Sequence, residues 1–106
     1  MEHLKKRSDF IYVSRGQKIV TPSFILLKNQ NRDELCKKPT FGFTVTKKIG
    51  TAVVRNRVKR RLKEAIRQIE SRVEKDNSYV IIARKKITDY PYSNLLTDLE
   101  NNLAPK

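Results

Sequence analysis

The sequence is poor in the residues that build metal sites and covalent cross-links. Its 106 residues include no tryptophan, one cysteine and one histidine. The single cysteine, Cys36, excludes a disulfide framework. The single histidine, His3, excludes a Cys/His zinc site and a histidine-based catalytic triad. No apolar run approaches the roughly 18 residues of a membrane-spanning helix, and the first ten residues lack the apolar segment of a signal peptide. We therefore expect a cytoplasmic protein that does not enter a membrane.

Negative charge is also scarce. The chain has 24 basic and 11 acidic residues and a net charge of +13. Residues 1–63 hold 17 basic and 4 acidic residues, whereas residues 64–106 hold seven of each, so the excess lies entirely in the first part. Self-repulsion of this size opposes folding unless a polyanion or salt relieves it. Nucleic acid is the polyanion we expect first, with an anionic membrane surface as the second choice.

The hydrophobic pattern predicts one domain, residues 1–106, of the mixed α/β class. A short helix is expected at 8–15, ended by Gly16, and a strand at 18–28 in which Pro22 indicates an edge or a bulge. A polar loop at 29–39 precedes a strand from residue 40, where Phe41, Phe43 and Val45 alternate with smaller residues. A long helix with Thr51 as its N-cap, an inner strand at 78–84 and a closing helix at 93–103 complete the order α-β-β-α-β-α.

The long helix, residues 54–73, is amphipathic. Its apolar positions fall within an arc of about 120° on a helical wheel: Val54, Val58, Leu62, Ala65, Ile66, Ile69 and Val73. The opposite face carries Asn56, Arg60, Lys63 and Arg67, flanked by Arg57 and Arg61 on one side and Lys59 on the other. Seven Lys or Arg residues stand between positions 55 and 67, against one acid, Glu64.

This distribution of charge disfavours the isolated helix. Like charges three or four residues apart repel by about 0.2–0.5 kcal/mol per pair. Arg55 and Arg57 also lie near the positive end of the helix dipole, where each cation costs about 0.3–1 kcal/mol. Bound phosphates would remove both penalties, so we favour phosphate binding over a merely solvated face. Lys47 and Lys48, just before the helix, would extend the same anion-binding corner. These residues alone do not distinguish RNA from DNA.

Residues 41–67, FGFTVTKKIGTAVVRNRVKRRLKEAIR, resemble the protein subunit of bacterial ribonuclease P. The family signature is a Lys-Lys pair, a turn containing glycine, an Arg-Asn-Arg helix and a following Lys-Arg pair. Its residues here are Lys47, Lys48, Gly50, Arg55, Asn56, Arg57, Lys59 and Arg60. The flanking segments LKKRSDF, SFILL and YVIIARK and the final amphipathic helix also agree, so the resemblance covers nearly the whole chain.

The resemblance implies an α/β sandwich with a mixed sheet and a left-handed β-α-β crossover around the basic helix, contrary to the usual rule. It implies one protein bound to one ribonuclease P RNA, with precursor tRNA as substrate and no DNA partner. That RNA would carry the catalytic centre and most of the Mg²⁺, so no catalytic residue is expected on this chain.

The resemblance also implies roles for individual residues. The expected RNA-binding residues are Lys47, Lys48, Arg55, Asn56, Arg57, Lys59, Arg60, Lys63 and Arg67. Phe10 and Leu27 would line the cleft for the 5′ leader, and the Asn56 amide would help order a metal near the RNA. The chain departs from the family at Ser14 and Leu27, where aromatic residues are frequent, and at Lys63, where arginine is frequent.

Two other functional hypotheses stay open. A ribosomal or general RNA-binding protein of similar fold would use the same basic helix as a structural clamp. A nuclease that acts without RNA would need clustered carboxylates for two-metal hydrolysis, and the acids here are scattered along the sequence.

Overall fold

The computed structural model describes residues 2–3, 7–32, 35 and 37–104. The strands are β1 (Glu2–His3), β2 (Gln17–Val20), β3 (Phe24–Gln30), β4 (Thr40–Thr44) and β5 (Asn77–Ala83). The α-helices are α1 (Arg7–Ser14), α2 (Ala52–Ile69) and α3 (Tyr92–Leu103), and three short 3₁₀ turns are η1 (Lys47–Ile49), η2 (Glu70–Arg72) and η3 (Lys85–Asp89). None of the helices in these ranges is long and apolar enough to cross a membrane.

The strands form one mixed sheet in the order β1-β4-β5-β3-β2. β4 and β5 are parallel neighbours joined through α2, and β3 runs antiparallel to both β5 and β2. The predicted α/β fold with a mixed sheet and three helices is confirmed. The left-handed sense of the β4-α2-β5 crossover stays a prediction.

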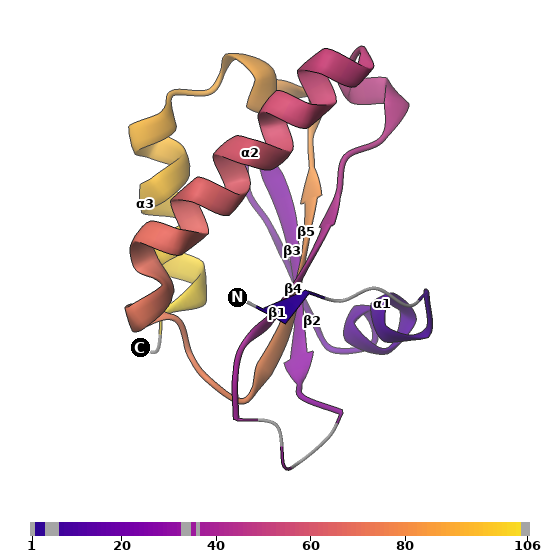
Figure 1. The fold of residues 1–106 in the computed structure, drawn as a ribbon, viewed down its shortest axis with the longest axis vertical. Helices are drawn as coiled ribbons and strands as arrows, with labels where there is room; N and C mark the ends of the chain where they lie inside the picture. Colours follow the sequence, from indigo (N-terminus) through magenta and orange to yellow (C-terminus); the bar gives the residue numbers. More distant parts are fainter. Residues whose placement is uncertain (1, 4–6, 33–34, 36, 105–106) are drawn as a thin grey trace.

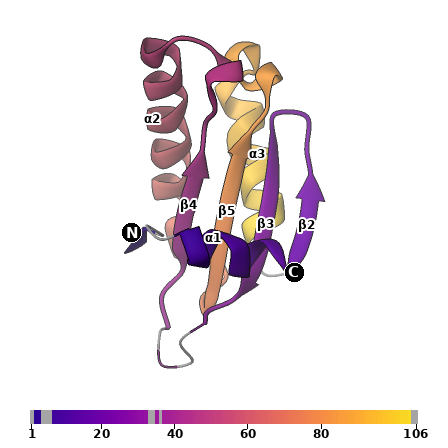
Figure 2. The same ribbon diagram turned by 90° about the vertical axis from the view of Figure 1, so that its right-hand side faces the viewer.

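Helices lie on both faces of the sheet (Figure 1). α2 and α3 cover one face, and the main core is packed between them and the sheet, with Phe41, Leu62 and Leu99 fully buried there. α1 packs on the other face, against β3 and β5. Figure 2 shows α1 crossing the lower part of the sheet, so that no helix of the described residues covers the upper part of this outer face.

The expected single strand at 18–28 is wrong, because this stretch forms a hairpin of β2 and β3. Thr21 and Phe24 close a two-residue turn that contains Pro22. The Thr21 amide donates to the Phe24 carbonyl at 2.9 Å, and the Phe24 amide donates to Thr21 Oγ1 at 3.1 Å. Proline suits this position because it has no amide hydrogen to pair in a ladder. With β1 as a further short strand, the order becomes β-α-β-β-β-α-β-α.

The long helix agrees closely with its sequence pattern. Thr51 is the N-cap as predicted, and its Oγ1 accepts a hydrogen bond from the Val54 amide. The predicted apolar stripe is buried from Val58 to Val73, and Val54 packs against the edge of the core. Since burial fixes this face inward, the basic residues on the opposite face of α2 must point outward.

Candidate nucleic-acid interface

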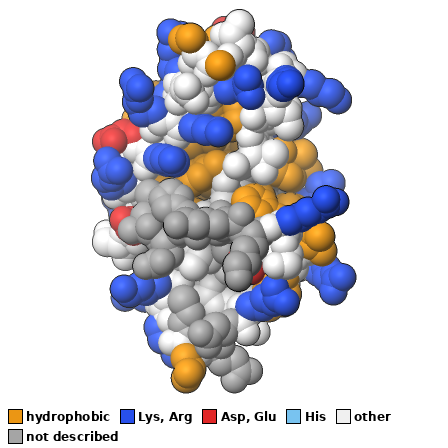
Figure 3. All heavy atoms as spheres, turned by 45° about the vertical axis from the view of Figure 1, so that its right-hand side comes forward, with side chains coloured by type: hydrophobic (Ala, Val, Ile, Leu, Met, Phe, Trp, Pro, Cys, Tyr) orange, Lys and Arg blue, Asp and Glu red, His pale blue; other side chains and the backbone are white. Residues whose placement is uncertain are grey.

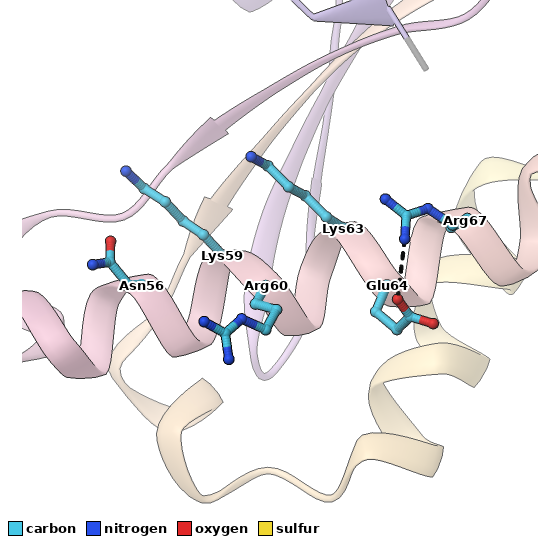
Figure 4. Close-up of a pocket in the computed structure, with 6 residues that line it drawn as sticks. All are labelled: Asn56, Lys59, Arg60, Lys63, Glu64 and Arg67. Carbon is cyan, nitrogen blue, oxygen red and sulfur yellow. Dashed lines mark hydrogen bonds and ion pairs between the residues drawn. The ribbon is translucent and has the colours of Figure 1, made fainter.

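The outward face of α2 forms a cationic ridge around a shallow hollow. We define the α2 ridge as Arg55, Asn56, Arg57, Lys59, Arg60, Lys63 and Arg67. Five of these residues and Glu64 line a hollow of about 330 Å³. Figure 4 shows Lys59 and Lys63 leaving the helix on one side of the hollow and Arg60 on the other. The ridge therefore presents positive charge on both sides of a groove along the helix.

The charges of the ridge are mostly unopposed. Among the described residues, Glu64 is the one acid that lines the hollow, and it meets Arg67 Nη1 at 3.4 Å while both side chains are largely exposed. An exposed pair of this kind contributes little. Within the described ranges, Arg57, Lys59 and Arg60 have no acidic partner. The repulsion that the sequence predicted is thus present in the folded protein.

Arg55 adds a second unfavourable feature at the start of α2. Its Nε is buried and has no hydrogen-bond partner among the described residues. The first turn of α2 contains no acidic residue either, so the helix N-terminus keeps its positive partial charge. A donor that is buried without an acceptor costs about 1–3 kcal/mol. A phosphate bound at this end of the helix would supply the negative charge that its first turn lacks.

Lys63 differs from the expectation that it points straight outward. It is half-buried, and its ammonium nitrogen lies 6.0 Å from the centre of the Phe43 ring in β4. This is the outer limit of a cation–π contact. Lys63 therefore faces the β4 side of the groove, whereas Asn56, Arg60 and Arg67 are exposed as predicted.

Lys47 and Lys48 lie in η1 and are both exposed. Gly50 follows them with φ of 155°, and a Cβ there would come within 3.1 Å of Val54. This glycine lets η1 turn closely onto the start of α2, against which it packs. The segment that carries the Lys-Lys pair thus lies against the start of the basic helix, and the joining of their charges into one anion-binding corner stays a prediction. RNA contacts of these residues stay a prediction.

The sequence reasoning missed a third basic segment. Arg84, Lys85 and Lys86 follow β5, and η3, which holds the two lysines, packs against η1. A signal was available: β4 and β5 are parallel neighbours, so the segments after them emerge at the same edge of the sheet. Of the three side chains, Arg84 Nη1 donates to the Thr21 carbonyl at 2.8 Å and Lys85 Nζ to the Ile49 carbonyl at 3.0 Å. Lys86 is exposed at this corner.

The predicted leader-cleft residues both belong to the outer face of the sheet. In β3, Phe24 and Leu26 point into the main core, so Ile25 and Leu27 must face the α1 side. Leu27 pairs in register with Val80 and Lys18, and it is half-buried.

Phe10 lies on α1, which packs on β3 through the buried Val13, and is also half-buried. The structure thus brings Phe10 and Leu27 to the same side of the molecule.

Two side-chain contacts and one close backbone approach hold α1 over this face. Asn29 Nδ2 donates to the Tyr12 carbonyl at 3.0 Å, and Arg32 meets Asp9 at 3.5 Å. Gly16 permits the close approach, because a Cβ there would lie 2.1 Å from the Lys28 carbonyl oxygen. Beyond α1, the same face exposes hydrophobic side chains in its middle with Lys and Arg side chains around them (Figure 3).

The part of the chain that the structure describes offers no cluster of side chains for Mg²⁺. Residues 2–3, 7–32, 35 and 37–104 contain no group of three His, Cys, Asp or Glu side chains that could hold a metal. Asn56 lies beside Lys59 and Arg60, and a cationic neighbourhood disfavours a bound cation. The Asn56 oxygen could therefore meet a metal only where RNA phosphates supply the other ligands, and that contact stays a prediction.

Comparison with known proteins agrees with this architecture. The family model described as Ribonuclease P matches residues 1–105. The ribonuclease P protein component of Brucella melitensis is 39% identical over 97% of this chain and 78% of its own length. That of Gluconacetobacter diazotrophicus is 44% identical over 94% of this chain and 86% of its own length. The ribonuclease P protein of Thermotoga maritima has a similar structure, with a TM-score of 0.83, 27% identity and coverage of 97% and 96% of the two chains. The chain belongs to the ribonuclease P protein family.

Proposed function

We propose that this chain binds the RNA subunit of ribonuclease P through the α2 ridge and η1, and guides the 5′ leader of precursor tRNA along the outer face of the sheet. The RNA supplies the catalytic centre and binds Mg²⁺, and this chain supplies no catalytic residue. Together they release the leader as an endoribonuclease, with one protein per RNA, in the cytoplasm. DNA is not a partner.

The unpaired charge of the α2 ridge is the observation that carries the proposal. Arg57, Lys59 and Arg60 repel one another without an acidic partner in the described ranges, and Arg55 Nε is buried without an acceptor. A sugar–phosphate backbone laid along the ridge would neutralise these side chains. Release of condensed counterions would add to the affinity. Family membership supports ribonuclease P RNA as the source of those phosphates.

The outer face of the sheet supports a separate role toward the leader. Phe10 and Leu27 offer half-buried apolar surface, and Lys18 lies in register with Leu27 at the sheet edge. A single-stranded segment needs such a combination of stacking or apolar contact with nearby cations. Since Ser14 and Leu27 replace frequent aromatic residues, this face offers less stacking and relies more on charge.

Reconstitution tests the proposal. The protein is combined with a bacterial ribonuclease P RNA, and 5′ processing of precursor tRNA is measured at a Mg²⁺ concentration at which the RNA alone is slow. We expect the protein to accelerate processing, and an unchanged rate would contradict the proposal. RNA binding without stimulation would favour a general structural RNA-binding protein. Cleavage by nuclease-treated protein alone would instead favour an RNA-independent nuclease.

A further inference from the structure

Arg61 differs from the other arginines in the middle of α2. Arg57 and Arg60 are exposed, whereas Arg61 is half-buried. Its Nη2 donates to the Tyr90 carbonyl at 2.9 Å, and its Nη1 lies 3.4 Å from the Ile87 carbonyl in a weaker second bond. Its guanidinium is thus turned to backbone carbonyls of the segment between β5 and α3 and away from the α2 ridge.

Several contacts fix this segment around Arg61. The Arg61 guanidinium carbon lies 5.9 Å from the centre of the Tyr92 ring, and the Tyr92 hydroxyl accepts a hydrogen bond from Gln68 Nε2 at 3.1 Å. The Tyr90 hydroxyl donates to Asp98 of α3 at 2.7 Å. Arg61 and Gln68 are two helical turns apart. Arg61 therefore holds the segment between β5 and α3, and Gln68 holds Tyr92, the first residue of α3.

The other end of the segment reaches the basic corner. Ile87 is buried in the core at 1% exposure, and Lys85 Nζ is bonded to the Ile49 carbonyl of η1. Between these two anchored residues stands Lys86, which is exposed. Its backbone position is therefore determined jointly by η1 and by the bonds that Arg61 makes just beyond it.

We propose that Arg61 is a positioning residue for RNA binding. It makes no contact with RNA, and it holds η3 against α2 so that the charge of Lys86 stays beside η1. This inference rests on the proposed function, in which η1 and the α2 ridge bind RNA. It assigns opposite roles to two adjacent arginines of one helix: Arg60 binds phosphate, and Arg61 orders the protein.

A double-mutant cycle tests the inference. Arg61→Met, Lys86→Met and the double variant are compared for affinity to a bacterial ribonuclease P RNA across a series of KCl concentrations, below the lowest melting temperature. We expect each single variant to weaken binding about three- to tenfold and to reduce the log–log salt slope by about one unit. The double variant should lose no more than either single variant, because both remove the same contact.

Two outcomes would overturn it. Additive losses, with the slope reduced by about two units in the double variant, would mean that Arg61 itself touches a phosphate. Unchanged binding in either single variant would also overturn it: in Lys86→Met the segment would not reach the RNA, and in Arg61→Met the segment would not need Arg61 to hold it.

The variant Arg60→Met distinguishes failure of this inference from failure of the proposed function. We expect its loss to be additive with that of Arg61→Met. An unchanged slope in Arg60→Met would count against the α2 ridge itself, independently of the cycle.

Arg61→Lys keeps the positive charge. If Arg61→Met does not fold, Arg61→Lys takes its place in the double-mutant cycle. An ammonium group lacks the planar fork that reaches two carbonyls, so we expect Arg61→Lys to show most of the loss in affinity. Hydrogen exchange at the Tyr90 amide, which bonds to the Ile87 carbonyl at 3.3 Å, should accelerate in the same variant. Wild-type affinity with unchanged exchange would show that only the charge matters and would overturn the positioning role.

Discussion

The ammonium group of Lys85 donates a hydrogen bond to the backbone carbonyl of Ile49 at 3.0 Å, and this bond joins η3 to η1. The two turns follow the parallel neighbours β5 and β4, so the bond links the segments that leave the sheet at one edge. Lys85 therefore uses its charge to stabilise the basic corner, although its sequence context alone would class it with the RNA-binding lysines.

Replacing Lys85 with methionine should lower the free energy of unfolding by about 1 kcal/mol, because a carbonyl loses its charged partner. Urea unfolding of the free protein measures this. Lys86→Met is the matched control, since Lys86 is exposed and adjacent, and its stability should change by less than about 0.5 kcal/mol. Equal stability of the two variants would mean that the Lys85 bond contributes nothing in solution.

Arg57→Ala should weaken RNA binding without harming the fold. Arg57 is exposed and has no acidic partner in the described ranges, so its loss relieves repulsion with its basic neighbours. We expect the salt slope of RNA affinity to fall by about one unit and the melting temperature of the free protein to stay equal or rise slightly. Lys75→Ala, an exposed cation after η2 and outside the ridge, should leave the slope unchanged. A large drop in stability for Arg57→Ala would identify this arginine as structural.

The sequence predicted α2 and its outward charges because both depend on local periodicity. Seven apolar positions recur every three or four residues, and the capping threonine precedes them directly. The β2–β3 hairpin was missed for a local reason too: β-prone residues continue on both sides of Pro22. Its turn lacks the Asn-Gly or Asp-Gly pair that marks short hairpins, and the Thr21 side chain closes it instead.

The role of Arg61 could not be predicted from the sequence. A helical wheel places it beside the ridge, but its partners are backbone carbonyls 26 and 29 residues further along the chain. Lys85 likewise bonds a carbonyl 36 residues away. Backbone acceptors carry no sequence signature, so only the tertiary packing separates these two cations from those that face outward.

Phe10→Ala should selectively impair binding of substrates that carry a 5′ leader. In the reconstituted complex, loss of a base contact on this ring is expected to cost about 1–3 kcal/mol for precursor tRNA. Mature tRNA should bind as before. Ile11→Ala is the control, because Ile11 is the next residue on α1 and is 44% exposed. An equal loss for precursor and mature tRNA would place Phe10 outside the leader path.

Raising the pH above 10 should remove the stability that the Tyr79 hydroxyl contributes to the fold. The pKa of Tyr79 is raised from 10.0 to about 12, mainly because the side chain is buried. The hydrogen bond from Asn77 lowers this pKa, and the nearby charge of Glu74 raises it. The Tyr79 hydroxyl donates to the Glu74 carbonyl at 2.8 Å, an interaction that needs the proton.

A folded-state pKa above the unfolded value means that the native protein holds this proton more tightly. The contribution of this proton to the free energy of unfolding is therefore complete below pH 10, and it is lost progressively as the pH rises toward about 12. We expect the free energy of unfolding of the wild type to fall by roughly 2 kcal/mol over that interval relative to Tyr79→Phe, which has no proton to lose. Urea unfolding of both proteins at a series of alkaline pH values measures the difference. Parallel pH profiles for the two would show that Tyr79 ionises equally in the folded and unfolded chains.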